Sequence, residues 1–206
     1  MDLIQVLGTA LGAAWTSGIN LYATVAALGL LQHFHLVGRL PGGLDALDNP
    51  WIIGVACALY LVEFVADKVP YVDSVWDVVH TFIRVPAGAA LALAATTELH
   101  PTVRVLAVLL GGTLALSAHG TKATLRAAAN TSPEPLTNWL LSLGEDVLAV
   151  GAVVLAVLYP LALLFVLAAF VLLLVWLLPK VLRGLRRLFA GARQLLAGRP
   201  VSRQHT

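Results

Sequence analysis

The sequence predicts an all-α fold, a polytopic helical bundle of about six membrane spans. The first observation is composition: 59% of the residues are hydrophobic and 12% are charged, whereas about a quarter of a soluble domain is charged. The second is length, because residues 147–179 contain no Asp, Glu, Lys or Arg and a span needs ~20 apolar residues. The third is a polar interruption in a long apolar segment of each half. Together they predict an internally repeated membrane protein.

The two interruptions lie at corresponding points. The apolar segment 3–31 is interrupted by Ser-Gly-Ile-Asn at 17–20, and the segment 103–129 by Ser-Ala-His-Gly at 117–120. Broken helices at matching positions in two halves predict a binding site near the bilayer midplane. The residues that match at an offset of one hundred are Ser17, Ala23, Thr24 and Ala27 with Ser117, Ala123, Thr124 and Ala127.

The spans divide into two repeats within one transmembrane domain, residues 1–179. Repeat one covers about 1–98 and repeat two about 101–179. Three spans per repeat is an odd number, so the second half enters the membrane in the opposite sense, and we expect an inverted repeat of three plus three with broken first and fourth helices. The expected spans are 3–31, 51–66, 73–95, 102–129, 136–158 and 160–178.

A basic tail follows the last span. Residues 180–206 hold seven of the thirteen Lys and Arg residues, and basic flanks mark the cytoplasmic side of a membrane. Six spans would then place both termini in the cytoplasm. We expect this tail to meet anionic lipid headgroups rather than nucleic acid, with a short surface helix at 183–196. The tail residues are Lys180, Arg183, Arg186, Arg187, Arg193, Arg199 and Arg203.

The single cysteine, Cys57, lies in an apolar segment. It allows neither an intrachain disulfide nor a cysteine metal cluster, and we interpret it as a small buried hydrophobe. The N-terminus lacks the basic region and cleavage site of a signal peptide. We therefore expect the first helix to be retained as a span. The sequence also predicts no bound cofactor.

The richest polar segment lies between residues 63 and 84. Its ionisable residues recur at spacings of three and four, which places them on one helical face. Ionisable residues within a span are costly and are candidates for function. The alternative is a cytoplasmic amphipathic elbow with solvated charges and local ion pairs. The candidates are Glu63, Asp67, Lys68, Asp73, Asp77, His80 and Arg84.

The second half supplies a complementary face. His119, Lys122 and Arg126 follow one another at helical spacing, and Glu145 and Asp146 lie inside the fifth expected span. A basic face opposite an acidic face predicts a buried charge network, which could bind a substrate or only hold the bundle together. The remaining candidates come from the interruptions: Ser17, Asn20 and Ser117.

A metal site is an alternative interpretation of one motif. Asp73, Asp77 and His80 have the spacing of ligands on a helix, and carboxylate-rich sets suit magnesium, manganese or calcium. The pattern is short and common, so its specificity is low.

Several motifs resemble those of a bacterial integral-membrane family catalogued as domain of unknown function 4126. The resemblance covers about residues 5–160; one departure is Val85, where that pattern has a proline before Pro86. It implies a repeated membrane core and a bacterial inner-membrane location, but no substrate. The motifs are Ser-Gly-Ile-Asn-Leu-Tyr at 17–22, Glu-Phe-Val-Ala-Asp-Lys at 63–68, the Asp-rich stretch 73–84, Pro-Ala-Gly at 86–88, Ser-Ala-His-Gly-x-Lys at 117–122 and Asn-Thr-Ser-Pro-Glu-Pro at 130–135.

Three functions remain open from the sequence. The favoured one is a small transporter or channel, expected as a homodimer. Half-helix N-termini after Ser17 and Ser117 would offer free amides to an anionic or phosphate-bearing substrate. Lys122, Arg126 and Arg84 would add positive charge, while Glu63, Asp67 and His80 could relay protons or hold a cation. The second is a metal-dependent, membrane-embedded enzyme acting on a lipid or polyprenyl phosphate. The third is a structural membrane subunit. The sequence leaves enzymatic activity undecided, with transport favoured.

Overall fold

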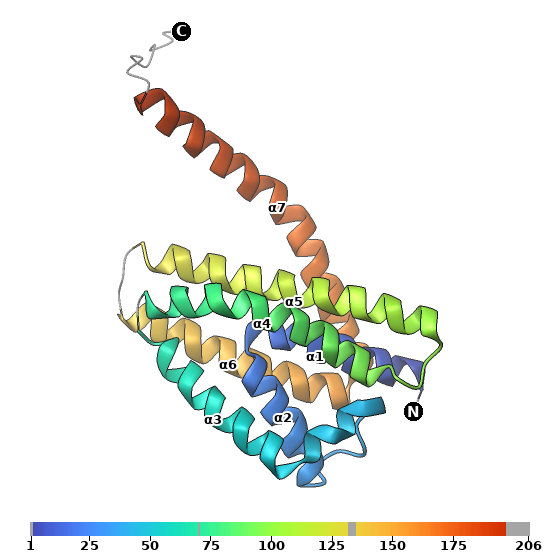
Figure 1. Ribbon diagram of the computed structural model, residues 1–206. Helices are drawn as coiled ribbons and strands as arrows, with labels where there is room; N and C mark the ends of the chain where they lie inside the picture. The colour runs from blue at the N-terminus through green and yellow to red at the C-terminus, as the bar shows by residue number, and fades with distance from the viewer. Residues whose placement is uncertain (1, 70, 132–134, 197–206) are drawn as a thin grey trace. The chain divides into compact units, whose positions relative to one another are not determined.

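The computed structural model describes residues 2–69, 71–131 and 135–196. In this part of the chain the regular elements are all helices, so the predicted all-α class is confirmed (Figure 1). The tail residues Arg199 and Arg203 lie outside the described residues. The helices in chain order are α1 (Leu3–Ile19), α2 (Leu21–His33), the 3-10 helix η1 (Gly42–Asp48), α3 (Pro50–Ala66), α4 (Val72–Ala95), α5 (Pro101–Ala129), α6 (Pro135–Leu158) and α7 (Pro160–Leu196).

Local sequence sets where the helices begin. Asn49 caps α3 through a bond from the backbone N–H of Trp51, and His100 caps α5 through a bond from the N–H of Thr102. Each cap is followed by a proline, which lacks the N–H that would be unsatisfied at that position. The expected starts at 51 and 102 are therefore one residue late.

Four helices are long and apolar enough to cross a membrane: 72–95, 101–129, 136–158 and Pro160–Val181. η1 and α3, bent by 78° at their junction, would together make a fifth. The described part of the chain is thus helical, with four or five helices that could span a membrane where the sequence predicts six. The difference lies in the first two predicted spans. The first forms two shorter helices, α1 and α2, and the second, α3, qualifies only together with η1.

The interruption predicted at 17–20 is present and lies at Asn20. This residue has an extended backbone (φ −147°, ψ 102°) and is the C-cap of α1 and the N-cap of α2. Its N–H donates to Thr16 O, and its side-chain oxygen accepts from the N–H of Ala23 at 2.9 Å. One asparagine therefore satisfies backbone groups on both sides of the break.

α1 and α2 return to the end of the bundle from which they started. Val6 of α1 lines a cavity with Leu40, which follows α2, and with Leu99, in the turn between α4 and α5. Gln5 likewise shares a cavity with Leu40 and with Leu158 at the end of α6. Figure 1 shows the N-terminus beside the α4–α5 turn. We call this the N-terminal end, and the opposite end, where α3, α5 and the start of α6 meet, the polar end.

The prediction of a break at 117–120 is wrong, because α5 is continuous from Pro101 to Ala129. The polar residues of this stretch bond to their own helix. Ser117 donates to Thr113 O at 2.7 Å and Thr121 donates to Ser117 O at 2.8 Å. Hydroxyls that bond to the preceding turn do not interrupt a helix, so only the first interruption is a real break.

Small residues bring α1, α4 and α5 into close contact. A Cβ on Gly18 would collide with the carbonyl oxygen of Ala115, and a Cβ on Gly111 would lie 3.2 Å from the Cβ of Ala14. Ala14 therefore lies beside Gly111, and Gly18, four residues later in α1, lies beside Ala115, four residues later in α5. The two helices thus run in the same direction where they cross. Close approach through small residues is the usual packing of membrane helices.

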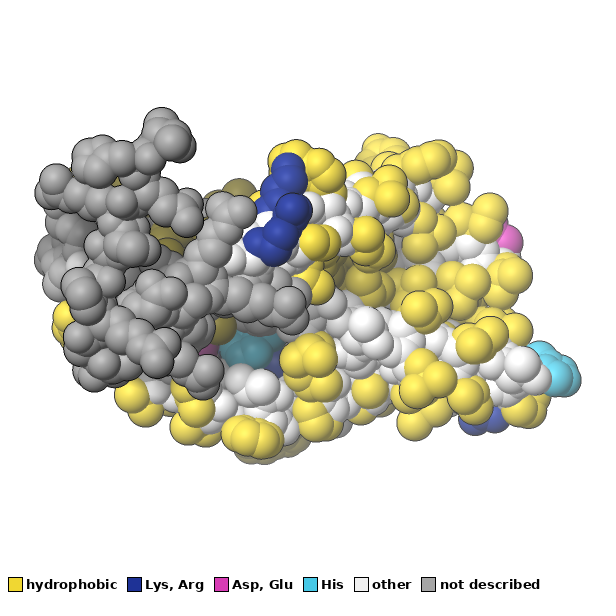
Figure 2. Space-filling view, turned by 90° about the horizontal axis from the view of Figure 1, so that it is seen from above, with side chains coloured by type: hydrophobic (Ala, Val, Ile, Leu, Met, Phe, Trp, Pro, Cys, Tyr) yellow, Lys and Arg dark blue, Asp and Glu magenta, His cyan; other side chains and the backbone are white. Residues whose placement is uncertain are grey.

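The two ends of the bundle differ in chemistry. The half toward the N-terminal end has an apolar core, with buried residues such as Ala10, Leu28, Leu91 and Val153. Outward-facing side chains are also apolar, and Figure 2 shows a face dominated by hydrophobic groups. The buried charged residues lie in the other half, toward the polar end.

The chain forms two compact units, residues 1–164 and 165–206. The second unit contains the rest of α7. Within it the Nζ of Lys180 lies over the ring of Trp176, 2.9 Å from its centroid, a cation–π contact. The fold described above belongs to the first unit.

Candidate functional site

Polar faces from four helices meet inside the first unit, as the spacing predicts. α4 contributes the acidic face and α5 the basic face, while the end of α3 and the first half of α6 add carboxylates. The opposite side of α4 is exposed, for example Val75 and Phe82. We call the ion-paired residues, together with His119, which hydrogen-bonds to Arg84, the buried charge network: Glu63, Asp67, Asp73, Asp77, Arg84, His119, Lys122, Arg126 and Glu145.

Arg84 binds the inner part of this network. Its Nη2 lies 2.5 Å from Glu63 Oε1, and its Nη1 lies 3.3 Å from Asp77 Oδ1. Its Nη1 also lies 3.0 Å from Nδ1 of His119. The side chain of Arg84 is fully buried. A guanidinium presents several donors in a planar fork, which lets one residue join α3, α4 and α5.

The contact with Arg84 fixes the tautomer of His119. A guanidinium can only donate, so Nδ1 accepts and carries no proton. The ring proton of the neutral imidazole is then on Nε2, which lies 2.8 Å from Thr81 Oγ1 and 3.0 Å from Asp77 O. This assignment follows from the hydrogen-bond partners.

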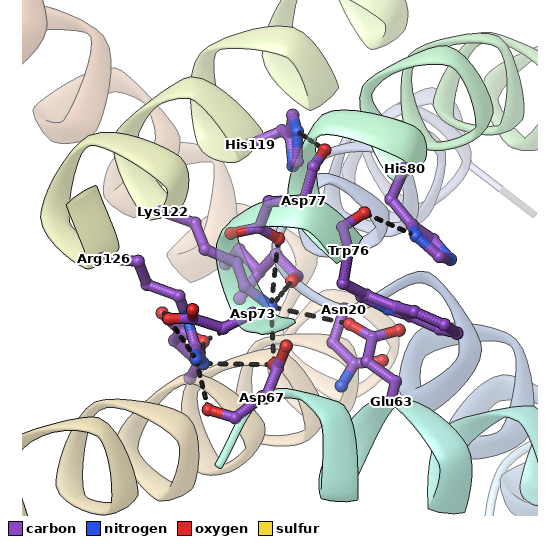
Figure 3. A network of polar contacts seen from close by, with 12 residues as sticks. Asn20, Glu63, Asp67, Asp73, Trp76, Asp77, His80, His119, Lys122 and Arg126 are labelled. Atoms are coloured by element: carbon purple, nitrogen blue, oxygen red, sulfur yellow. Dashed lines mark hydrogen bonds and ion pairs between the residues drawn. The ribbon is translucent and has the colours of Figure 1, made fainter. Parts of the chain in front are cut away.

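Lys122 lies at the centre of the network (Figure 3). Its Nζ is 2.8 Å from Asp67 Oδ2, 3.5 Å from Glu63 Oε1 and 3.4 Å from Glu145 Oε2. It also donates to the carbonyl of Ile19, the last residue of α1, at 3.2 Å. Lys122 therefore connects the network to the break between α1 and α2.

Arg126 is the cationic residue of the network that lies nearest the polar end. It donates to the carbonyl of Asp67 at 2.6 Å and to Asp67 Oδ2 at 3.1 Å. Its Nη2 also pairs with Glu145, and its Nη1 lies 3.6 Å from Asp73 Oδ2. Asp73 in turn accepts from the amide of Asn130 at 2.9 Å.

Acids outnumber bases in the buried charge network, since five carboxylates face three cationic side chains. A sixth carboxylate, Asp146, lies nearby and accepts from the amide of Asn20 at 3.0 Å. Four buried carboxylate oxygens have no hydrogen-bond partner among the described residues, and buried polar groups of this kind are normally satisfied. They are Glu63 Oε2, Asp67 Oδ1, Asp77 Oδ2 and Asp146 Oδ2.

His80 lies beside the network and makes no ion pair with the described residues. Its Nδ1 bonds to Trp76 O at 2.8 Å, and its ring stacks on that of Trp76. Its Nε2 lies 3.2 Å from the hydroxyl of Tyr22. Because Nδ1 faces a carbonyl, it carries a proton, and Nε2 of the neutral ring accepts from the tyrosine.

A family model described as a domain of unknown function (DUF4126) matches residues 7–180. The chain belongs to this family. The resemblance of the sequence motifs is thereby confirmed, and the match covers the whole buried charge network. No curated protein and no solved structure matches the chain.

Two of the predicted site residues lie away from the network in this DUF4126 member. The hydroxyl of Ser17 donates to Ala14 O at 2.7 Å, and that of Ser117 bonds to Thr113, in both cases within one helix. Their hydroxyls support the α1 and α5 backbones instead of facing the carboxylates.

Lys68 lies at the edge of the site. Its Nζ donates to Ser142 Oγ and to Phe64 O, both at 3.1 Å, and lies over the Phe64 ring. Burial lowers the pKa of the Lys68 ammonium, and nearby Asp146 and Asp67 oppose that shift. Lys68 thus covers the polar end of this site.

The metal interpretation of Asp73, Asp77 and His80 is not supported. Within the described ranges, no three His, Cys, Asp or Glu side chains form a group that could hold a metal ion. The reason is that the three residues bond in different directions. Asp73 faces Asn130, Asp77 pairs with Arg84, and His80 bonds to the backbone of its own helix.

The prediction omitted several polar residues that complete the DUF4126 site. Asn138 donates to Asn130 Oδ1 at 3.0 Å, which orients the amide that bonds Asp73. Asn138, Ser142 and Asp146 recur every four residues along α6, and this stripe was the available signal. The carbonyl of Ile19 has no sequence signal, because its role depends on the break that follows it.

Proposed function

We propose that this protein is a small membrane transporter or channel for protons or a small monovalent cation, with the buried charge network as its site. The observation that carries the proposal is the excess of carboxylates over cationic side chains, together with the four carboxylate oxygens that lack partners among the described residues. Ionisable groups inside membrane bundles mark ion pathways and proton relays.

A cation is favoured over the anion expected from the sequence. That expectation depends on half-helix N-termini at the interruptions and on cationic groups that are free to receive a substrate. Arg84, Lys122 and Arg126 are each paired with at least two carboxylates. An anion would have to separate these ion pairs, whereas a proton or cation would relieve the excess negative charge.

A broken helix supports this proposal. In transporters, half-helix C-terminal ends and freed backbone carbonyls coordinate cations. Here the C-terminal end of α1 directs the carbonyl of Ile19 at the ammonium of Lys122. We propose that α1 and α2 form a re-entrant pair, which is tolerated because its break is buried in protein, and that α3 to α7 supply five crossings. The predicted inverted repeat would then apply at most to the helices that follow the pair.

Charge favours one orientation of this arrangement. Lys68 lies at the polar end, and the basic tail follows a helix that begins at the N-terminal end and is long enough to cross. We propose that the polar end faces the cytoplasm of a bacterial inner membrane. The tail is then cytoplasmic and can contact anionic lipid headgroups, but the N-terminus lies on the other side. This differs from the sequence prediction because α1 and α2 together do not cross.

Reconstitution in proteoliposomes tests the proposal. Proton, sodium and potassium fluxes would be measured with dyes under an imposed gradient, for the unaltered protein, Asp77→Asn and Glu63→Gln. Both variants keep the side-chain shape and remove one charge. We expect the unaltered protein to conduct at least one of these ions and the two variants to fall to background.

The matched control is Asp45→Asn. Asp45 pairs with Arg39 at the N-terminal end, where the arginine is 80% exposed, so its charge lies outside the proposed path and flux should be unchanged. If the unaltered protein carries no tested cation while it remains folded, transport is rejected. The network would then be a device that holds the helices together, a role its many mutual ion pairs also fit.

A further inference from the structure

The surroundings of the Lys122 ammonium are unusual. Five oxygen atoms lie within 3.9 Å of Nζ, and they come from the end of α1, the end of α3 and its cap, α4 and α6. Figure 3 labels three of the residues that supply them, Glu63, Asp67 and Asp77, around Lys122. We call them the oxygen cage. They are Ile19 O, Glu63 Oε1, Asp67 Oδ2, Asp77 Oδ1 and Glu145 Oε2.

The oxygen cage offers more acceptors than one ammonium can use. A lysine has three N–H donors, yet five oxygens surround it, four of them on carboxylates. Three of these carboxylates, Glu63, Asp67 and Asp77, each keep a second oxygen that is buried and has no hydrogen-bond partner among the described residues. Backbone carbonyls and carboxylates are also the oxygen ligands that hard cations prefer.

The cation inside this cage is tethered. Nζ is carried on a flexible four-carbon stem from α5, and Lys122 is 3% exposed. Arg84 and Arg126 lie on either side and hold the same carboxylates independently, because Arg84 pairs with Glu63 and Arg126 with Asp67 and Glu145. The oxygens would therefore stay in place if the ammonium moved away.

We propose that the oxygen cage is a binding site for a free monovalent cation of ammonium size, and that Lys122 fills it as a tethered competitor. The inference rests on the proposed function and names the substrate class of that site. The cage holds one positive charge at a time, either the Lys122 ammonium or the free cation. Entry of the cation displaces Lys122, and the return of Lys122 releases the cation.

Chemical rescue of Lys122→Met tests this directly in purified full-length protein. Methionine matches the lysine side chain as far as Cε and lacks Nζ, so the substitution removes the charge and vacates the position that the ammonium holds. Its thermal unfolding would be followed in methylammonium, ammonium, potassium or N-methylglucamine chloride at equal ionic strength. A ligand that binds only the folded state raises the melting temperature with its concentration. We expect saturable stabilisation of Lys122→Met by methylammonium and ammonium and none by bulky N-methylglucamine. In the unaltered protein the response should need a higher concentration, because Lys122 competes for the cage.

The matched control is Lys68→Met. Lys68 lies at the same end of the bundle, but its ammonium contacts Ser142 and Phe64 instead of the cage, so small cations should not stabilise this variant. A second variant, Lys122→Met with Glu145→Gln, removes one negative charge with the positive one and keeps four cage oxygens and a carbonyl-type fifth. It should respond to methylammonium at higher concentration.

The outcomes separate this inference from the proposed function. If neither Lys122 variant responds to any small cation, or neither can be purified even in methylammonium, the tethered-competitor proposal is overturned. A saturable response without flux in proteoliposomes would keep the cage and reject transport. Flux without such a response would keep transport and reject the cage.

Discussion

At the scale of single residues, Arg84 has the most demanding environment. Its side chain is fully buried, and it faces Glu63, Asp77 and the unprotonated nitrogen of His119. Breaking a buried pair by removing one partner leaves an uncompensated charge, which costs about 3–5 kcal/mol. Arg84 is therefore the residue on which the inner network depends.

We predict that Arg84→Met lowers the free energy of unfolding by about 3–5 kcal/mol. Adding Glu63→Gln should recover part of the loss, because it removes the carboxylate that lost its shortest ion pair and keeps only the 3.5 Å contact with Lys122. The unaltered protein, the two single variants and the double variant form a thermodynamic cycle. Their unfolding in mixed micelles measures the coupling energy between Arg84 and Glu63. Arg39→Met is the control, since its exposed ion pair with Asp45 is worth about 0–1 kcal/mol. Strictly additive losses would show that Arg84 and Glu63 do not interact.

Asn20 and Asp146 provide a second test at this scale. Asn20 accepts from the N–H of Ala23 and donates to Asp146. We predict that Asn20→Asp alone is destabilising, because it keeps the cap but places two carboxyl groups together. Exchanging the pair, Asn20→Asp with Asp146→Asn, should restore most of the melting temperature, because an aspartate also caps a helix and an asparagine can donate back. An exchanged protein no more stable than the single variant would contradict this.

At the scale of elements, the sequence predicted the helices well and misjudged one interruption. The expected spans from 51 onward begin within one residue of α3 to α7. Both interruptions look alike as sequence, since each combines a serine with glycine and a larger polar residue. They differ because Asn20 caps two helices from an extended backbone, whereas Ser117 and Thr121 bond within α5. That choice depends on tertiary partners, which a single sequence does not reveal.

Helix packing supplies the element-scale prediction. Gly88 of α4 approaches two helices, and a Cβ there would lie 2.5 Å from the Cβ of Ala115 and 3.0 Å from Ser17 Oγ. We predict that Gly88→Val destabilises the bundle by about 1–3 kcal/mol, as overpacking does. At Gly54 of α3, no described atom lies within 4 Å of the position that a Cβ would take, so Gly54→Val is the matched control. Equal melting temperatures for the two variants would exclude close α1–α4–α5 packing.

At the scale of the whole molecule, most of the candidate site followed from helical spacing. The face from Asp73 to Arg84 and the face from His119 to Arg126 do meet, as predicted. What the spacing could not give is the balance of charge, because that depends on which carboxylates reach the same cations. The predicted anion preference came from the cations and from helix N-termini expected at the two interruptions. Three-dimensional pairing removes the cations as free groups, and α5 has no N-terminus at Ser117 because it is continuous.

The path of the chain across the membrane gives the whole-molecule prediction. On a Cys57→Ser background, single cysteines at Leu3, Gly38 and Thr131 would be labelled in intact cells with an impermeant maleimide. We expect Leu3→Cys and Gly38→Cys to share one side and Thr131→Cys to lie on the other, because α1 and α2 return to the same end. Labelling of Leu3→Cys and Gly38→Cys from opposite sides would show that the first two helices cross.

The break at Asn20 also bears on how the protein is made. The amide of Asn20 is matched by Asp146, 126 positions later, and the carbonyl of Ile19 by Lys122. Lipid offers no substitute for these partners, because the hydrocarbon interior contains no water. α1 and α2 precede α5 and α6 in the chain, so they reach their final places only after these later helices have been synthesised, and the order of insertion differs from the order of the sequence.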